Sequence, residues 1–300
     1  MGAELKKIGA LIDTTRPEAK VAIVLSYQSR WSLDAVSSSG VLPLQFSNDG
    51  MNAHAAAGAY HEALMDLSIC TDAMDPTEDL SQYALVIAPR LYCVDARTVE
   101  NLVTFVENGG VLCLTPRSGV VDEYNVIFNQ PAPGPLRGIA GVEVDDYTAL
   151  DGPLPLQAGA DGPAGIEEAT GWADEIIPTS AEVVATFDGG WLAGAPAITV
   201  NAYGKGKVVY VGCLLRNETL KAFVGWLCEL ADVPSGLGTP VGVRAYERRN
   251  DAARLLFLTN FSAATQSILL DGEWENTLTG EFVSQVELKP AAVQILKRAL

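Results

Sequence analysis

The sequence is poor in positive charge and in histidine. Its 300 residues include 20 Lys or Arg against 37 Asp or Glu, a formal net charge of −17, and two histidines. A chain with this excess of negative charge repels phosphate backbones and anionic lipid headgroups, because both bind proteins mainly through Lys and Arg. We therefore expect neither nucleic acid nor a membrane surface among its partners.

Long hydrophobic runs are also missing. No apolar stretch reaches the roughly 18–20 residues needed to cross a bilayer. Glu4, Lys6 and Lys7 stand where a signal peptide would require an apolar segment. The sequence therefore predicts a cytoplasmic protein. Apolar residues at 48% and charged residues at 19% exclude collagen-like, coiled-coil and disordered classes.

Metal-binding and disulfide patterns are absent as well. The five cysteines are scattered, odd in number and without a C-x-x-C pair, which predicts reduced thiols in the core. His54 and His61 are seven residues apart on a predicted helix, whereas a two-histidine metal site prefers a spacing of four. We expect no metal ion and no cofactor.

What the sequence does contain is an alternation of short apolar strands with amphipathic helices. Strands are predicted at residues 21–25, 69–73, 85–88 and 111–115. Helices are predicted at residues 51–68 and from an Asp95 cap to a stop at Gly109. Fully apolar strands between helices indicate a parallel sheet covered on both faces. The fold class is therefore α/β with a doubly wound parallel sheet.

The pattern changes after residue 142. A β-rich insert at about 142–200 precedes a hairpin turn at 203–207, a strand at 208–213 and a last helix to residue 230. Beyond a Gly- and Pro-containing linker, short alternating stretches at 241–247, 254–259, 266–270 and 293–296, with turns at 271–272 and 279–280, indicate a small antiparallel all-β domain. We divide the chain into a linker helix (1–17), an α/β domain (18–234) and a β domain (239–300).

Candidate functional residues follow the strands, because loops leaving the carboxyl ends of parallel strands share one edge of the sheet. Arginines and aromatic residues, which are enriched at interfaces, gather there with polar side chains. An alternative is that these residues are salt-bridged loop residues that hold one another. The predicted interface or ligand edge consists of Tyr27, Arg30, Trp31, Arg90, Tyr92, Arg117, Asp122, Glu123 and Asn125.

Two possible catalytic features are weak. Cys113 has Val111 and Thr115 where a nucleophile elbow needs small residues, and both histidines precede it, so a core thiol is the better interpretation. Asn217-Glu218 imitates a glycosidase acid/base pair, but Asn217 is suited to cap the last helix and Glu218 to occupy its first turn. We predict no catalytic residue.

Several segments resemble the middle domain of glycoside hydrolase family 42 β-galactosidases. They include residues 21–24 with 29–31, 79–89, 106–110, 117–125, 133–137 and 204–208, and the tail from about 239 resembles that family's C-terminal domain. The resemblance implies a class I glutamine amidotransferase-like (flavodoxin-like) fold that forms trimers. It places catalysis on two glutamates of an N-terminal (β/α)₈ barrel, which has no counterpart in this sequence.

The resemblance therefore implies the non-catalytic assembly region of an enzyme of carbohydrate metabolism that hydrolyses terminal β-D-galactosides. Its expected partners are further copies in a homo-oligomer, with a trimer implied by the family, and a catalytic barrel encoded elsewhere. The alternative is a free-standing amidotransferase-like enzyme or sugar-binding protein that uses the strand-end edge as its pocket.

Overall fold

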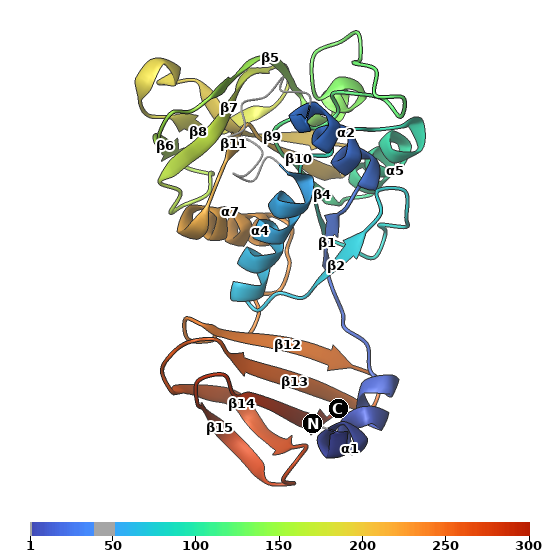
Figure 1. The fold of residues 1–300 in the computed structure, drawn as a ribbon, viewed down its shortest axis with the longest axis vertical. Helices are drawn as coiled ribbons and strands as arrows, with labels where there is room; N and C mark the ends of the chain where they lie inside the picture. The colour runs from blue at the N-terminus through green and yellow to red at the C-terminus, as the bar shows by residue number, and fades with distance from the viewer. Residues whose placement is uncertain (1, 39–51) are drawn as a thin grey trace. The chain divides into compact units, whose positions relative to one another are not determined.

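The computed structural model describes residues 2–38 and 52–300. They form two compact units (Figure 1). The α/β unit consists of Lys20–Ala63 and Thr71–Pro234, and the β unit consists of Ser235–Leu300 with Leu64–Cys70 and the chain up to Ala19. Residue 51, the first residue of the helix predicted at 51–68, lies outside the described residues.

Five parallel strands form the centre of the α/β unit. They are β1 (Val21–Val24), β2 (Thr71–Met74), β3 (Leu85–Ala88), β4 (Val111–Leu114) and β10 (Gly206–Val211), in the order β2-β1-β3-β4-β10. Every residue of β1, β3 and β4 is buried. Burial on both faces explains why their sequences are continuously apolar rather than alternating.

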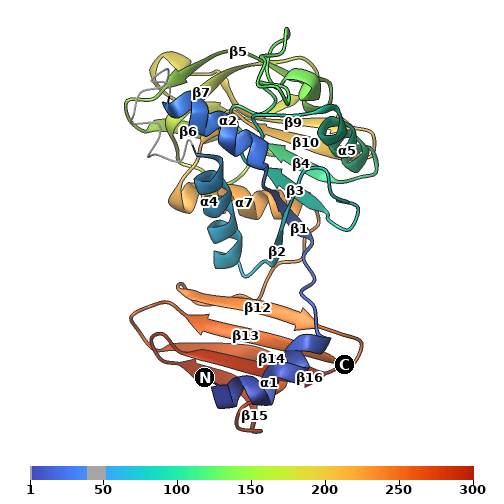
Figure 2. The ribbon, with the colours of Figure 1, turned by 45° about the vertical axis from the view of Figure 1, so that its right-hand side comes forward.

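Helices cover both faces of these strands. Figures 1 and 2 show α4 (Ala53–Asp66) and α7 (Asn217–Leu230) side by side on one face and α5 (Ala96–Glu107) on the other. The carboxylate of Asp95 caps α5 by accepting a hydrogen bond of 2.7 Å from the Thr98 amide. Gly109, with φ +114°, takes the left-handed conformation that follows the helix end. The α/β class is thus confirmed.

The insert adds antiparallel strands to the same sheet. These are β5 (Val142–Ala149), β6 (Leu154–Ala158), β7 (Glu168–Pro178), β8 (Glu182–Phe187) and β9 (Pro196–Tyr203), with β11 (Cys213–Leu214) beside β7. The remaining short elements are η1 (Gly134–Leu136), α6 (Arg137–Ala140) and η2 (Gly190–Leu192). Strand β9 pairs antiparallel with β10 across the predicted hairpin turn. The described strands of the α/β unit therefore form one mixed eleven-stranded sheet rather than a purely parallel one.

An antiparallel sheet forms most of the β unit. Its strands are β12 (Val243–Arg249), β13 (Ala253–Asn260), β14 (Gln266–Asn276), β15 (Phe282–Leu288) and β16 (Val293–Ala299), in the order β12-β13-β16-β14-β15. The turn predicted at 271–272 is wrong: the chain continues in β14, and only the register against β15 shifts between Leu269 and Trp274. The buried indole of Trp274 holds this segment in the core. Strand β15 was not predicted.

Helix α1 (Gly2–Thr14) belongs to the β unit instead of standing alone as a linker. The guanidinium of Arg248 donates to the carbonyl oxygens of Ile12 and Thr15, at 3.2 and 2.7 Å, and Arg16 forms a backbone bridge with Arg249. Within the described residues, no helix combines the length and apolarity needed to cross a membrane.

Candidate functional site

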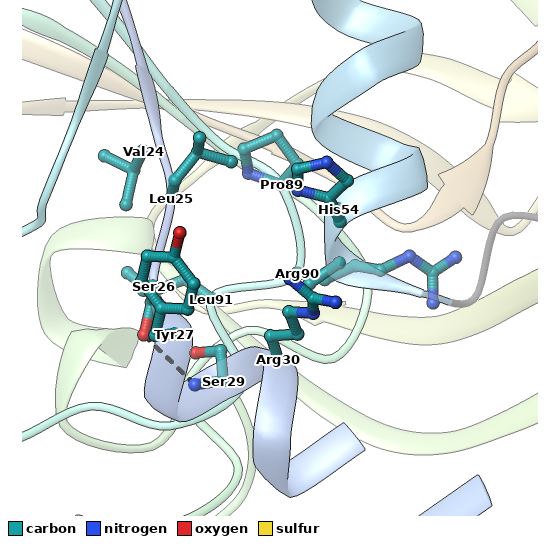
Figure 3. Close-up of a pocket in the computed structure, with 11 residues that line it drawn as sticks. Val24, Leu25, Ser26, Tyr27, Ser29, Arg30, His54, Pro89, Arg90 and Leu91 are labelled. Atoms are coloured by element: carbon teal, nitrogen blue, oxygen red, sulfur yellow. Dashed lines mark hydrogen bonds between the residues drawn. The ribbon is translucent and has the colours of Figure 1, made fainter. Parts of the chain in front are cut away.

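A hollow lies where the order of the parallel sheet changes direction. The chain leaves β1 toward β2 on one side and continues to β3 on the other, and open α/β sheets bind ligands at such a switch point, outside the carboxyl ends of the strands. Figure 3 shows the side chains that surround this hollow. They come from the ends of β1 and β3 and the starts of two helices: Val24, Leu25, Ser26, Tyr27, Ser29, Arg30, Ala53, His54, Pro89, Arg90 and Leu91.

Three of the predicted edge residues lie on helix α2 (Tyr27–Ser38) rather than in a loop. The hydroxyl of Ser26 accepts a hydrogen bond of 3.1 Å from the Ser29 amide, which is the N-cap pattern that starts a helix. Tyr27 and Trp31 therefore lie one turn apart, with ring centres separated by 5.9 Å and side chains 62% and 65% exposed. The Arg30 Nε is 3.8 Å from Asp34 in an exposed pair that contributes little stability.

Arg90 and Tyr92 are buried members of the predicted edge. The Arg90 side chain is completely buried, and Tyr92 is 4% exposed. Arg90 has the left-handed φ of +50°, and its amide donates a hydrogen bond of 2.7 Å to the Thr115 hydroxyl. Burial, together with the nearby charge of Arg117, lowers the pKa of Arg90 to about 9. The side chain remains a cation at neutral pH.

Arg117 packs among aromatic rings. Its guanidinium carbon lies 5.0 Å from the centre of the Tyr92 ring, 5.5 Å from that of Trp172 and 6.0 Å from that of Tyr147. The Tyr147 and Trp172 rings are themselves stacked at 4.6 Å. This arrangement brings together two predicted residues, Tyr92 and Arg117, through a cation–π contact rather than a salt bridge. Cation–π contacts of this kind stabilise a partly buried guanidinium.

Asp174, which the sequence analysis missed, lies at the centre of the same cluster. Its carboxylate accepts hydrogen bonds of 2.7 Å from the Trp172 indole and of 2.7 Å from the Tyr210 hydroxyl. Burial raises the pKa of Asp174 to about 6. The hydrogen bonds from Trp172 and Tyr210 act in the opposite direction, as do the positive charges of Arg117 and Arg90. Asp174 is one of three acidic residues in β7, so no signal in the sequence distinguished it or identified these partners.

The loop carrying Asp122, Glu123 and Asn125 stands beside α2. Cys93 links the two, because the Ser29 hydroxyl bonds with the backbone of Cys93 and the Cys93 thiol donates to the Asp122 carbonyl at 3.1 Å. The Asp122 carboxylate accepts hydrogen bonds from the backbone amides of residues 124 and 126. Asn125 has the left-handed φ of +63°, and the Glu123 side chain is exposed. Asp122 thus shapes the loop. The sequence analysis missed its exposed apolar side chains, Tyr124, Val126 and Ile127.

The structure describes both features that the sequence analysis rejected as catalytic, Cys113 and Asn217-Glu218. Cys113 is fully buried, and burial raises the pKa of its thiol well above the ordinary range. The prediction that Asn217 caps α7 is wrong: the helix begins at Asn217, which has φ +50°, and the capping position is Arg216. Glu218 does occupy the first turn. Among residues 2–38 and 52–300, no three His, Cys, Asp or Glu side chains lie close enough together to hold a metal ion.

Comparison with known proteins gives consistent matches. Residues 19–234 match the family described as β-galactosidase trimerisation domain, and residues 242–298 match the β-galactosidase C-terminal domain. The chain is 34% identical over 304 residues to β-galactosidase BgaA of Planococcus sp. (strain 'SOS Orange') and 32% identical to BgaP of Planococcus sp. (strain L4). Each alignment covers 99% of this chain and 44% of the relative.

Solved structures agree with this match. The β-galactosidase from Bacillus circulans sp. alkalophilus superposes with a TM-score of 0.90 at 30% identity, covering 99% of this chain and 44% of that one. Gan42B, a family 42 β-galactosidase from G. stearothermophilus, gives a TM-score of 0.88 at 26% identity. The chain spans less than half the length of these relatives. It therefore belongs to the glycoside hydrolase family 42 β-galactosidases and comprises their trimerisation and C-terminal domains, the non-catalytic part of the family's architecture.

Proposed function

We propose that this chain assembles a β-galactosidase into a homotrimer. The observation that carries the proposal is the match of residues 19–234 to the trimerisation domain. The enzyme so assembled would hydrolyse terminal β-D-galactosides on a catalytic barrel outside this chain. Four buried thiols, those of Cys93, Cys113, Cys213 and Cys228, are consistent with a reducing compartment, which supports a cytoplasmic location.

The surface proposed for assembly combines α2 with the neighbouring loop. We call Tyr27, Trp31, Tyr124, Val126 and Ile127 the assembly surface; each is more than half exposed. Cys93 holds the helix and the loop next to each other through its contacts with Ser29 and Asp122. Exposed aromatic and large aliphatic side chains are typical anchors of protein interfaces, where they gain most from leaving water. The occupant proposed for this surface is a second copy of the chain.

A second candidate function, sugar binding, is favoured by the hollow at the switch point. Its lining combines an aromatic ring, Tyr27, with the polar side chains of Ser26, Arg30 and His54. Aromatic surface with a few polar groups is a common composition for small-ligand sites. Titration of the chain with galactose, followed by the fluorescence of Trp31, tests this candidate, and the Trp31→Phe variant shows whether the signal comes from that residue.

Trimer formation is tested by the mass of the chain in light scattering over a range of concentrations. We expect the chain to form a trimer that dissociates on dilution. In the Trp31→Ser variant, this dissociation should already occur at a higher protein concentration than in the unaltered chain. Trp191→Ser is the matched control, because Trp191 is also 65% exposed but lies on η2 in the insert. A monomer at every concentration overturns the proposed function, and equal dissociation of both variants overturns the assembly surface.

A further inference from the structure

A larger hollow than the one at the switch point lies between α7 and the strands β8, β9 and β10. Its volume is about 430 Å³, which falls within the range of small-molecule sites. It shares no lining residue with the switch-point hollow and none with the proposed assembly surface. We call this hollow the α7 groove, and its lining includes Glu182, Val184, Val200, Ala202, Lys207 and Trp226.

The floor of the α7 groove is one face of the sheet. Glu182 on β8 is paired with Val200 on β9, and Ala202 on β9 is paired with Lys207 on β10. Paired residues, and residues two apart on one strand, project to the same face, so these four side chains share it. The valine and alanine form an apolar floor. A carboxylate stands on one side of that floor and an ammonium group on the other.

Trp226 on α7 forms the wall that faces this floor. The centre of its ring lies 5.9 Å from that of Phe223, which is fully buried. Its indole N–H donates a hydrogen bond of 3.3 Å to the Asp161 carbonyl. The indole is therefore held by two contacts, although part of it remains exposed. An aromatic ring that is already fixed loses little conformational freedom when a ligand binds.

The loop that carries Asp161 is itself fixed against β8. The Gly159 amide donates a hydrogen bond of 2.8 Å to the Val184 carbonyl. A Cβ atom at Gly162 would overlap the same carbonyl oxygen, so only glycine allows the loop to approach so closely. This close approach places the Asp161 carbonyl where it holds the Trp226 indole at the rim of the groove.

The two charged side chains of the floor are available to a ligand. Among residues 2–38 and 52–300, the Glu182 carboxylate and the Lys207 ammonium form no hydrogen bond or ion pair with the protein, and both side chains are exposed. The Asn201 amide also borders the groove, but it is bonded to the Ile139 carbonyl and to the Ser180 hydroxyl. Recognition therefore depends on the carboxylate, the ammonium group and the indole.

This combination of groups suits a neutral ligand rich in hydroxyls. A hydroxyl donates to a carboxylate and accepts from an ammonium group, whereas a charged ligand would be repelled by one of the two. The C–H face of a pyranose ring is apolar and packs on an aromatic face such as that of Trp226. An apolar surface with a few polar groups at its sides is also typical of small-ligand sites.

We propose that the α7 groove binds a neutral saccharide. A sugar ring stacks on Trp226, and its hydroxyls form hydrogen bonds with Glu182 and Lys207. The site is separate from the switch-point hollow, and it does not depend on the proposed assembly into a trimer.

The test is isothermal titration of the chain with lactose and, in parallel, with sorbitol, which carries hydroxyls but no ring. We expect saturable binding of lactose and at least tenfold weaker binding of sorbitol. Glu182→Gln and Lys207→Gln should each weaken lactose binding at least threefold. The matched controls are Glu168→Gln and Lys205→Gln, because these residues are exposed, belong to the same unit and do not line the groove.

Two further variants test the shape of the groove. Ala202→Trp fills it without changing its charge, at an exposed position that tolerates a larger side chain, and should weaken lactose binding at least tenfold. Trp226→Leu retains an apolar contact with Phe223 but removes the ring, so we expect a loss of similar size.

Absence of saturable lactose binding overturns the proposal. Equal binding by the parent and Ala202→Trp also overturns it, because the sugar would then lie elsewhere, for example in the switch-point hollow. Equal affinity for lactose and sorbitol contradicts stacking on the indole and overturns the assignment of a saccharide. Light scattering on the same samples keeps this result separate from the proposed assembly, since a variant that loses lactose binding should retain the mass of the parent.

Discussion

The Tyr210 hydroxyl donates a hydrogen bond of 2.7 Å to the Asp174 carboxylate, although their strands are far apart in the order of the sheet. Tyr210 lies on the parallel strand β10, and Asp174 lies on β7 of the insert. The bond therefore ties the antiparallel insert to the centre of the α/β unit. Because both side chains are buried, the carboxylate is sensitive to any loss of its partners.

The first prediction concerns pH. Burial raises the pKa of Asp174 from 3.8 to about 6, so the folded chain holds this proton more tightly than the unfolded chain does. The resulting stabilisation is complete below about pH 4 and is lost as the pH rises through 6. At 1.36 kcal/mol per unit of pKa, it amounts to about 3 kcal/mol.

Urea unfolding of the parent and Asp174→Asn between pH 4 and pH 7 measures this effect. The difference in unfolding free energy, parent minus variant, should fall by about 3 kcal/mol over that range. Because all other titrating groups are common to both proteins, parallel profiles would contradict the assignment of Asp174.

A second prediction concerns the aromatic surroundings of Arg117. Replacement by Lys keeps the positive charge but loses the planar group that packs on Tyr92 and Trp172, so we expect Arg117→Lys to destabilise the chain by about 1–2 kcal/mol. Arg137→Lys should cost less than about 0.5 kcal/mol, because its pair with Glu143 is partly exposed. Equal losses in urea unfolding would mean that the aromatic contacts add nothing.

Cys113 gives a third prediction. Cys113→Ala should lower the unfolding free energy by about 1–2 kcal/mol, as a small truncation in a packed core, and leave the oligomeric state unchanged. Cys113→Ser should cost more, because it buries a hydroxyl beside apolar neighbours. If Cys113→Ala removed an enzymatic activity instead, the amidotransferase-like alternative would gain support.

The fourth prediction is that this chain does not hydrolyse nitrophenyl β-galactoside. Glycoside hydrolysis needs two facing carboxylates, and Glu218 stands exposed in the first turn of α7, where the helix dipole accounts for it. Release of nitrophenol is followed for the chain and for Glu218→Gln. Turnover in the chain that disappears in Glu218→Gln would assign a catalytic role to this residue.

Local patterns in the sequence determined the individual elements of the fold. The continuous apolar residues of β1, β3 and β4, the Asp95 cap and the glycine after α5 each act within a few neighbouring residues, so they can be recognised without knowing the rest of the molecule. The same holds for the alternation that predicted most of the β unit. Strand β15 escaped because few of its side chains are buried, which leaves a weak pattern.

Tertiary structure alone decided which polar residues meet. Arg90 and Tyr92 follow a strand end like their neighbours, yet the chain turns them inward, and no local pattern distinguishes them from exposed loop residues. Asp174 reaches Tyr210, 36 residues away, because the insert folds back across the sheet. Contacts between distant segments depend on how strands are ordered and paired, and that order is set by the packing of the whole unit rather than by the residues beside each group.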